Sequence, residues 1–283
     1  MTLDDTAASA VHEDFRVPVT ANHPSSESRS IGFMARALVQ TTIPHRAQAA
    51  LHFQRRNGDL TLTMVGHPDH GLPYDKIPRL LLARIAQRAR VTGSRVIALD
   101  SAQAVLFRDL GLQMSGGRNG SMASFRDQLL RLMKCMLHID RKTAQGAAWQ
   151  PYQFSSGISL WWDDGRREKA ACWIELAPNF YDEITTRAVP LDFSVLVALR
   201  SPLAIDLYAW ATDRVFRLHK PVLVAWPALR DQFGADYARE QDFRRAFAKA
   251  LGRVYAHWPA LRAETQQKGL RLRPCRPHIV PRL

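Results

Sequence analysis

Cysteines are few in this sequence, and it has no long apolar run. Its three cysteines, Cys135, Cys172 and Cys275, are odd in number, far apart and without a CxxC pair. This spacing argues against a disulfide scaffold and against a zinc ribbon. No apolar run approaches the roughly 18 residues that cross a bilayer, and the acidic start "MTLDDTAASAVHEDF" lacks the apolar stretch of a secretory signal. We therefore expect a cytoplasmic protein with no membrane partner.

A convergent set of catalytic groups is also missing. The glycine-rich "SGGRNGS" has neither the lysine nor the spacing of a phosphate-binding loop. His67 and His70 in "HPDH" have no third metal ligand in sight, and Asp163 and Asp164 occupy the turn of an expected hairpin. These absences argue against an enzyme, a metal site and a bound cofactor.

Positive charge dominates what is present. The 283 residues include 39 Lys or Arg against 26 Asp or Glu, a net charge of +13, and the isoelectric point is near 10.3. Residues 236–283 hold 11 Lys or Arg and 4 Asp or Glu, a net charge of +7 in the last sixth of the chain. Such a surface attracts polyanions. Nucleic acid is the favoured partner, because no segment suits a membrane.

The same order of predicted elements occurs twice along the chain. Each half has a long helix, a short strand, a short helix ending in Leu-Gly or Phe-Gly, a loop, a long helix that opens with Phe-Arg, and a hairpin. This is the order of a winged helix, a helix-turn-helix with a hairpin beside it. We predict an α+β, helix-rich fold of tandem winged-helix (helix-turn-helix) domains. The expected division is a disordered N-terminal tail at residues 1–32, a first domain at 33–176 that supports dimerisation and a second at 177–283.

The stretch "DFRRAFAKALGRVYAHW" (242–258) predicts a helix with two different faces. Its buried seam is expected to hold Phe243, Phe247, Ala250 and Val254. Arg245, Lys249 and Arg253 form a cationic stripe, and Gly252 on that side leaves room for another molecule at a cost of about 1 kcal/mol to the helix. In the second helix of a helix-turn-helix, these cations and Arg244 would contact DNA bases or phosphates. The alternative is an ordinary solvated face.

Further candidate DNA contacts lie in the last hairpin and in the first unit. In "GLRLRPCRPH", Arg271 and Arg273 share one face of a strand and Arg276 lies beyond, although charge that guards an edge strand has the same pattern. The first unit offers candidates before or along its long helix, where a helix start favours phosphate. They are Arg118, Asn119, Ser121, Ser124, Arg126 and Lys134.

The long helix of the first unit, "SMASFRDQLLRLMKCML", is more apolar than its counterpart. Ser124 and Asp127 resemble a capping box that opens the helix. Its buried seam is predicted to contain Phe125, Leu129, Leu132 and Met136. A second apolar stripe consists of Leu130, Met133 and Leu137. We expect much of the surface of this helix to contact the other unit or a second subunit.

Five stretches resemble plasmid-encoded replication initiators of the RepA type. They are "GLPYDKIPRLLLARIA", "LGLQMSGGRNGSMASFRDQLLRLM", "ELAPNFYDEITTRAVPLD", "SPLAIDLYAWATDRV" and "WPALRDQFGADYAREQDFRRAFAKAL". Together they cover about residues 70–280, and the last is similar to the wider group of iteron-binding initiators. The N-terminal 30 residues carry no such resemblance.

The resemblance implies two winged-helix units that bind repeated sites, the iterons, in double-stranded origin DNA. It implies that the second unit is the main DNA-reading domain, with Arg244, Arg245 and Lys249, and that the first supports dimerisation and auxiliary DNA contact through residues 118–124. Its further implied actions are origin opening, recruitment of host DnaA and the replicative helicase, and repression of its own gene by dimers.

Two other functions remain as alternatives at this point. A winged-helix transcriptional regulator without an initiation role would need the same helix in the same groove. A rolling-circle nuclease would need a tyrosine nucleophile and a His-hydrophobic-His metal motif, and the sequence has no such histidine pair.

Overall fold

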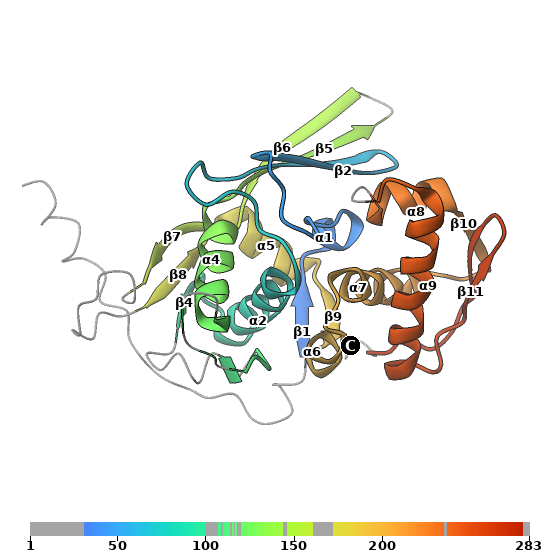
Figure 1. Ribbon diagram of the computed structural model, residues 1–283. Helices are drawn as coiled ribbons and strands as arrows, with labels where there is room; N and C mark the ends of the chain where they lie inside the picture. Colours follow the sequence, from blue (N-terminus) through green and yellow to red (C-terminus); the bar gives the residue numbers. More distant parts are fainter. Residues whose placement is uncertain are drawn as a thin grey trace, which may run out of the picture.

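Two long helices from opposite halves of the chain, α2 (Lys76–Thr92) and α7 (Pro202–Phe216), pack together at the centre of the structure (Figure 1). The structure is a computed structural model and describes residues 31–99, 107–108, 110–113, 115, 117, 120–143, 146–160, 172–234 and 237–279. Every residue of α7 from Leu203 to Thr212 is buried, as expected for a helix enclosed on all sides. In the described part of the chain, no helix is both long and apolar enough to cross a membrane.

The second half continues from α7 as a strand, two helices and a hairpin. These elements are β10 (Val222–Ala225), α8 (Trp226–Phe233), α9 (Glu240–His257), β11 (Ala263–Gln266) and β12 (Gly269–Leu272). The three strands form an antiparallel sheet in the order β10-β12-β11. Gly269 permits this pairing, because a Cβ there would stand 2.0 Å from the carbonyl oxygen of Val224. The order of elements predicted for this half is confirmed.

The first half repeats part of this plan around α2. Its corresponding elements are β4 (Val96–Ala98), α4 (Ser121–Lys134), β7 (Ser155–Ser159) and β8 (Trp173–Leu176). The strands again form a sheet whose middle strand is the last in sequence, in the order β4-β8-β7. Residues 107 and 108, between β4 and α4, are helical. The antiparallel pairing of the hairpin that the sequence predicts for this half is confirmed by β7 and β8. Its predicted turn, with Asp163 and Asp164, lies outside the described residues.

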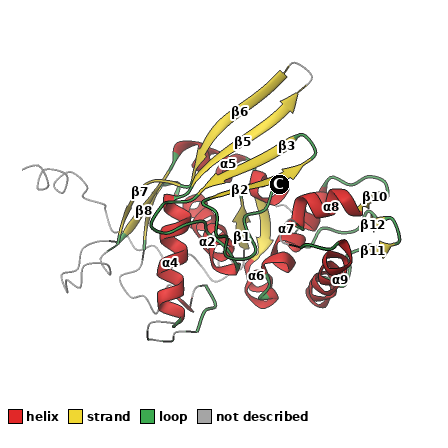
Figure 2. Ribbon diagram, turned by 45° about the horizontal axis from the view of Figure 1, so that its top comes forward, coloured by secondary structure: helices red, strands yellow, loops and turns green. Residues whose placement is uncertain are grey.

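An additional four-stranded sheet covers one end of the first half, in the order β2-β3-β5-β6. Its strands are β2 (His52–Asn57), β3 (Leu60–Val65), β5 (Met136–Thr143) and β6 (Gly146–Gln153). The long β5 and β6 hairpin projects from the body of the molecule (Figure 2). The alternation of apolar and polar residues in "DLTLTMV" is typical of a strand and agrees with β3, whereas β5 and β6 were not expected. Mixed polar and apolar residues in "MLHIDRKT" give neither a clean strand nor a clean helix period.

A two-stranded sheet joins the two halves. Strand β1 (Ile31–Met34) pairs antiparallel with β9 (Val189–Asp192), and it packs against α2. Among the described residues, the other named helices are α1 (Arg36–Gln40), α5 (Pro178–Thr186) and α6 (Phe193–Leu199). Ile31 and Gly32, which the sequence assigns to the tail, instead open β1. The rest of that tail lies outside the described residues, and the domain boundary at 176/177 stays a prediction.

Two expectations for α4 are wrong. The helix begins at Ser121 after Gly120, so Ser124 lies inside its first turn and does not cap it. Asp127 instead pairs with Arg131 one turn later, at 2.7 Å between Oδ2 and Nε. The helix ends at Lys134, so Met136 is not part of its buried seam but the first residue of β5, where half of it is exposed. Phe125, Leu129 and Leu132 are buried as predicted.

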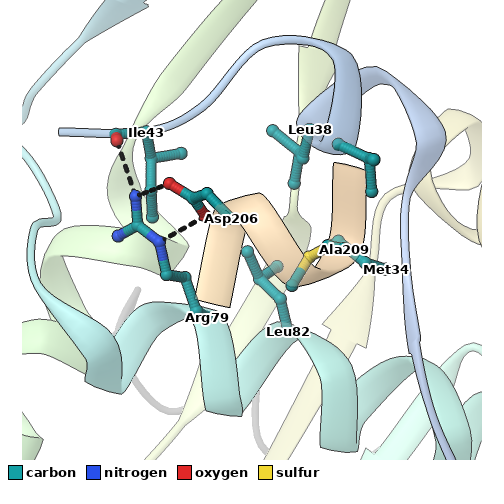
Figure 3. Close-up of a pocket in the computed structure, with 8 residues that line it drawn as sticks. Met34, Leu38, Ile43, Arg79, Leu82, Asp206 and Ala209 are labelled. Carbon is teal, nitrogen blue, oxygen red and sulfur yellow. Dashed lines mark hydrogen bonds and ion pairs between the residues drawn. The ribbon is translucent and has the colours of Figure 1, made fainter. Parts of the chain in front are cut away.

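A buried ion pair fastens α2 to α7. Arg79 on α2 donates from Nε to Asp206 Oδ1 at 2.7 Å and from Nη2 to Asp206 Oδ2 at 2.6 Å (Figure 3). Both side chains are almost fully buried, with 2% and 8% exposed. The remaining Arg79 donors reach the carbonyl oxygens of Asp75 and Ile43 at 2.6 and 2.8 Å. A bidentate pair with its other donors satisfied is the arrangement that a buried arginine requires.

His45 completes this buried network. Its Nε2 lies 2.8 Å from Asp206 Oδ2. Burial lowers the pKa of His45, although Asp206 opposes the shift, so the ring is neutral near pH 7 and donates to the carboxylate. Burial would raise the pKa of Asp206, but the charge of Arg79 and the hydrogen bonds from His45 and Arg79 outweigh it and lower that pKa. The cavity beside the pair is only about 10 Å³, room for at most one water molecule.

Replacing Asp206 by Asn should lower the free energy of unfolding by about 3–5 kcal/mol, because it leaves Arg79 buried and uncompensated. Asp242→Asn is the matched control, since Asp242 pairs with Arg239, whose side chain is 79% exposed, and an exposed pair contributes about 1 kcal/mol or less. Urea unfolding at pH 7 measures both. Because the folded pKa of Asp206 is lowered, its contribution is present above about pH 4 and is lost on further acidification. Equal effects of the two substitutions would contradict the role of the pair.

Candidate nucleic-acid interface

Helix α9 has one buried and one exposed face. The buried residues are Phe243, Phe247, Ala250, Leu251 and Val254, which confirms the predicted seam and adds Leu251. Phe243 and Phe247 pack edge-on against Trp226 of α8, with ring centroids 6.2 and 5.6 Å apart. These aromatic contacts fix which side of α9 faces solvent.

The exposed face of α9 carries the predicted cationic stripe. Arg245, Lys249 and Arg253 are all exposed. Within the described part of the chain, these three side chains form no hydrogen bond and no ion pair. The carboxylates of α9 lie in its first turn, where Asp242 pairs with Arg239 at 2.7 Å. The stripe therefore presents uncompensated positive charge to whatever approaches it.

Arg244 is placed differently from its neighbours. Its guanidinium pairs with Glu240 one turn earlier and lies over the Trp226 ring, 5.1 Å from the centroid. Trp226 in turn donates from Nε1 to the carbonyl oxygen of Gln266 at the end of β11, at 3.0 Å. Arg244 thus takes part in the junction of α8, α9 and the hairpin, and its assignment as a DNA contact stays a prediction.

Gly252 lies on the exposed side of α9, near Lys249 and Arg253. A Cβ at this position would meet nothing within 4 Å. Packing inside the protein therefore does not explain the glycine, which weakens a helix by about 1 kcal/mol relative to alanine. The smooth surface at Gly252 allows close approach by another molecule.

The hairpin carries further exposed cations. Arg271 on β12 is exposed and opposite Leu223 and Glu264 in the sheet. Arg273 is exposed on the same face and lies 4.0 Å from Glu264, and Arg276 is exposed beyond the strand. Sequence reasoning passed over two other exposed cations: Lys268 at the tip of the hairpin and Arg262 before β11. Their positions in the turn and just before the strand could have identified them from the sequence as exposed cations.

The candidate DNA-contact residues of the first unit are less free to contact DNA. Ser121 donates to the carbonyl oxygen of Gln113 and accepts from the amide of Ser115, so its hydroxyl is used within the loop. Lys134 is exposed but bonds His70 Nε2 at 3.1 Å, and Arg126 is half-buried. Ser124 is exposed on α4. Arg118 and Asn119 lie outside the described residues. The structure therefore shows a continuous cationic stripe on α9 and no comparable one on the described part of α4.

His67 and His70 lie close together, with ring centroids 5.2 Å apart. Burial, Lys134 and His67 lower the pKa of His70, which favours its neutral form beside the lysine. The described residues contain no group of three or more His, Cys, Asp or Glu side chains that could hold a metal ion.

The comparisons place this architecture among known folds. The chain is similar to the crystal structure of RctB domains 2-3, with a TM-score of 0.52 over 83% of this chain and 94% of that chain, at 13% sequence identity. The likeness defines the class as mixed α/β proteins with the fold of those two domains. A search of curated proteins gives no match.

The family follows from the sequence match. The family described as plasmid encoded RepA protein matches residues 72–226, more than half of the chain. The protein belongs to this family of plasmid replication initiators, as its resemblance to RepA-type initiators predicted. The matched range ends at the first residue of α8, so the basic helix and the hairpin lie beyond it.

Proposed function

We propose that this plasmid replication initiator binds repeated sites, the iterons, in double-stranded origin DNA. In this proposal α9 enters the major groove and the β11 and β12 hairpin lies on the adjacent backbone. The protein then promotes origin opening and recruits host DnaA and the replicative helicase, and it acts without catalysis of its own. Family membership supports the role in initiation, and the charge and exposure of α9 support the manner of binding.

The order of elements supports reading each half as a winged helix. Helix α7, strand β10, helices α8 and α9 and the final hairpin follow the order of a helix-turn-helix with a wing. In the first half, α2, β4, the helical residues 107 and 108, α4, β7 and β8 follow that order as far as the described residues extend, with β5 and β6 inserted before the hairpin. The shared strand order, β10-β12-β11 and β4-β8-β7, supports an equivalence of the two units.

One observation carries the assignment of the reading helix. Arg245, Lys249 and Arg253 are exposed and unpaired among the described residues, while the opposite side of α9 is buried. At 1.5 Å of rise per residue the stripe is about 12 Å long, close to the width of the major groove. Arg271, Arg273 and Arg276 extend the charge onto the hairpin, where phosphates of the same duplex would lie.

The first unit has a supporting role in this proposal. The half-buried Arg126 and the engaged Lys134 fit auxiliary contact with DNA better than base reading. Dimerisation through this unit remains part of the proposal. A transcriptional regulator with the same reading helix is the alternative, and family membership favours initiation over it.

The first test is duplex binding at several salt concentrations, with DNA that flanks the gene. Each phosphate contact contributes a slope of about −0.9 in log K against log[salt]. If each stripe residue contacts one phosphate, the triple variant Arg245→Ala, Lys249→Ala, Arg253→Ala should make the slope shallower by about 2.7. Arg56→Ala, which removes an exposed cation from β2, is the control and should leave the slope unchanged. Equal slopes for wild type and triple variant would exclude α9 as the reading helix.

A second test separates initiation from regulation alone. The gene is supplied in trans to a plasmid that carries the flanking DNA as its only origin. We expect wild type and Arg56→Ala to maintain the plasmid, and the triple variant to lose it because origin binding fails. A protein that binds this DNA and represses its promoter but never maintains the plasmid would favour the regulator.

A further inference from the structure

An open groove lies at the base of the hairpin, next to the C-terminal end of α9. Its volume is about 500 Å³, within the usual range for binding sites. Pro259 and Leu261 line it from the segment after α9, and Pro274 and Cys275 line it from the segment after β12. These four residues form the apolar floor of the groove, in which Leu261 is buried and Pro274 and Cys275 are partly exposed.

Two cations flank this apolar floor. Arg262 and Arg276 line the groove, both are exposed, and within the described part of the chain neither side chain has a hydrogen bond or an ion pair. Glu264, the carboxylate nearest to Arg262 in sequence, is 4.0 Å from Arg273 instead. A segment that complements this groove would carry an aromatic side chain for the apolar floor and carboxylates for the two arginines.

The chain itself contains such a segment. Residues 1–15 hold four acidic residues and no Lys or Arg, and they end in Glu13, Asp14 and Phe15. Within the first 30 residues this is the only aromatic side chain of the Phe, Tyr or Trp type, and it directly follows two carboxylates. Its chemistry therefore complements both the floor and the rim of the groove.

The connection to the folded body begins close to the groove. Ile31 pairs with Asp192, whose amide donates to Tyr208 Oη at 3.1 Å. Tyr208 Oη lies 2.7 Å from His278 Nδ1, and the His278 ring stacks on Trp258, the residue before Pro259. Phe15 precedes Ile31 by 16 residues, a length that spans up to about 55 Å. The acidic segment can therefore reach the groove of its own chain.

We propose that Glu13, Asp14 and Phe15 dock in this groove, with Phe15 on the floor and the two carboxylates beside Arg262 and Arg276. A tethered segment acts at an effective concentration in the millimolar range, so weak contacts suffice. Docking places negative charge on the basic surface next to the hairpin. The consequence for DNA, which rests on the function proposed above, is that the segment competes with phosphates and lowers duplex affinity.

Cys275 provides a readout that does not involve DNA. It lines the groove and is partly exposed, whereas Cys135 and Cys172 are buried and burial raises the pKa of Cys135 to about 12. The rate at which a maleimide alkylates Cys275 in the full chain is measured by peptide mass spectrometry. The alkylation rate should rise about two- to tenfold in a variant that combines Glu13→Gln, Asp14→Asn and Phe15→Ala. In wild type, the segment is present at a millimolar effective concentration and blocks the thiol for much of the time.

The control removes the same charge elsewhere in the segment. Asp4→Asn with Asp5→Asn should leave the alkylation rate near that of wild type. An unchanged rate in the triple variant, or a rise only in the control, overturns the docking of residues 13–15. A wild-type rate that falls with protein concentration would show docking between chains and would overturn the intrachain occupant.

The predicted effect on DNA affinity is tested separately. The variant with residues 13–15 substituted should bind the flanking duplex more tightly than wild type, with the larger difference at low salt. A faster thiol reaction without tighter DNA binding would retain the docking and refute the competition. Because the thiol readout involves no DNA, failure of the proposed origin binding leaves that part of the test intact.

Discussion

The Arg79 and Asp206 pair is the interaction on which the arrangement of the two halves depends. It joins the long helices α2 and α7, and its remaining hydrogen bonds hold residues 43–45 in place. The same connecting segment reaches α8, because Thr42 donates to the carbonyl oxygen of Gln232 and the Gln232 side chain donates back to that of Gln40. A charge buried this deeply tolerates little displacement of its partner. These contacts connect the elements that carry α9 to the first unit.

Packing around α8 decides which cations of α9 are free. Trp226 contacts Phe243 and Phe247 on one side and the Arg244 guanidinium on another, and it also bonds the end of β11. One indole thereby orients the helix, occupies one arginine and positions the hairpin. The next cations along the helix are left exposed, so side chains that are adjacent in sequence have different physical roles.

Much of the fold was predictable because it follows from local signals. The glycine that ends the short helix and the period of Phe243, Phe247 and Val254 predicted helices of the second half. The start of α4 and the β5 and β6 hairpin were not predictable, because Gly120 offers no side-chain cap and the hairpin carries no clean alternation. Exposure of the stripe could be expected from its period. The engagement of Arg244 with Trp226 is a tertiary contact, and no sequence spacing reports it.

The most direct measurement of whether the exposed side of α9 lies against DNA is the substitution Gly252→Ala, followed by unfolding and duplex binding on the same protein. The added methyl meets nothing in the protein and should stabilise the helix by about 1 kcal/mol. Against a DNA backbone in close contact it should lower affinity about tenfold, equivalent to ~1.4 kcal/mol. Greater stability with weaker binding is the predicted result. Greater stability with unchanged binding would mean that this side of α9 faces only water.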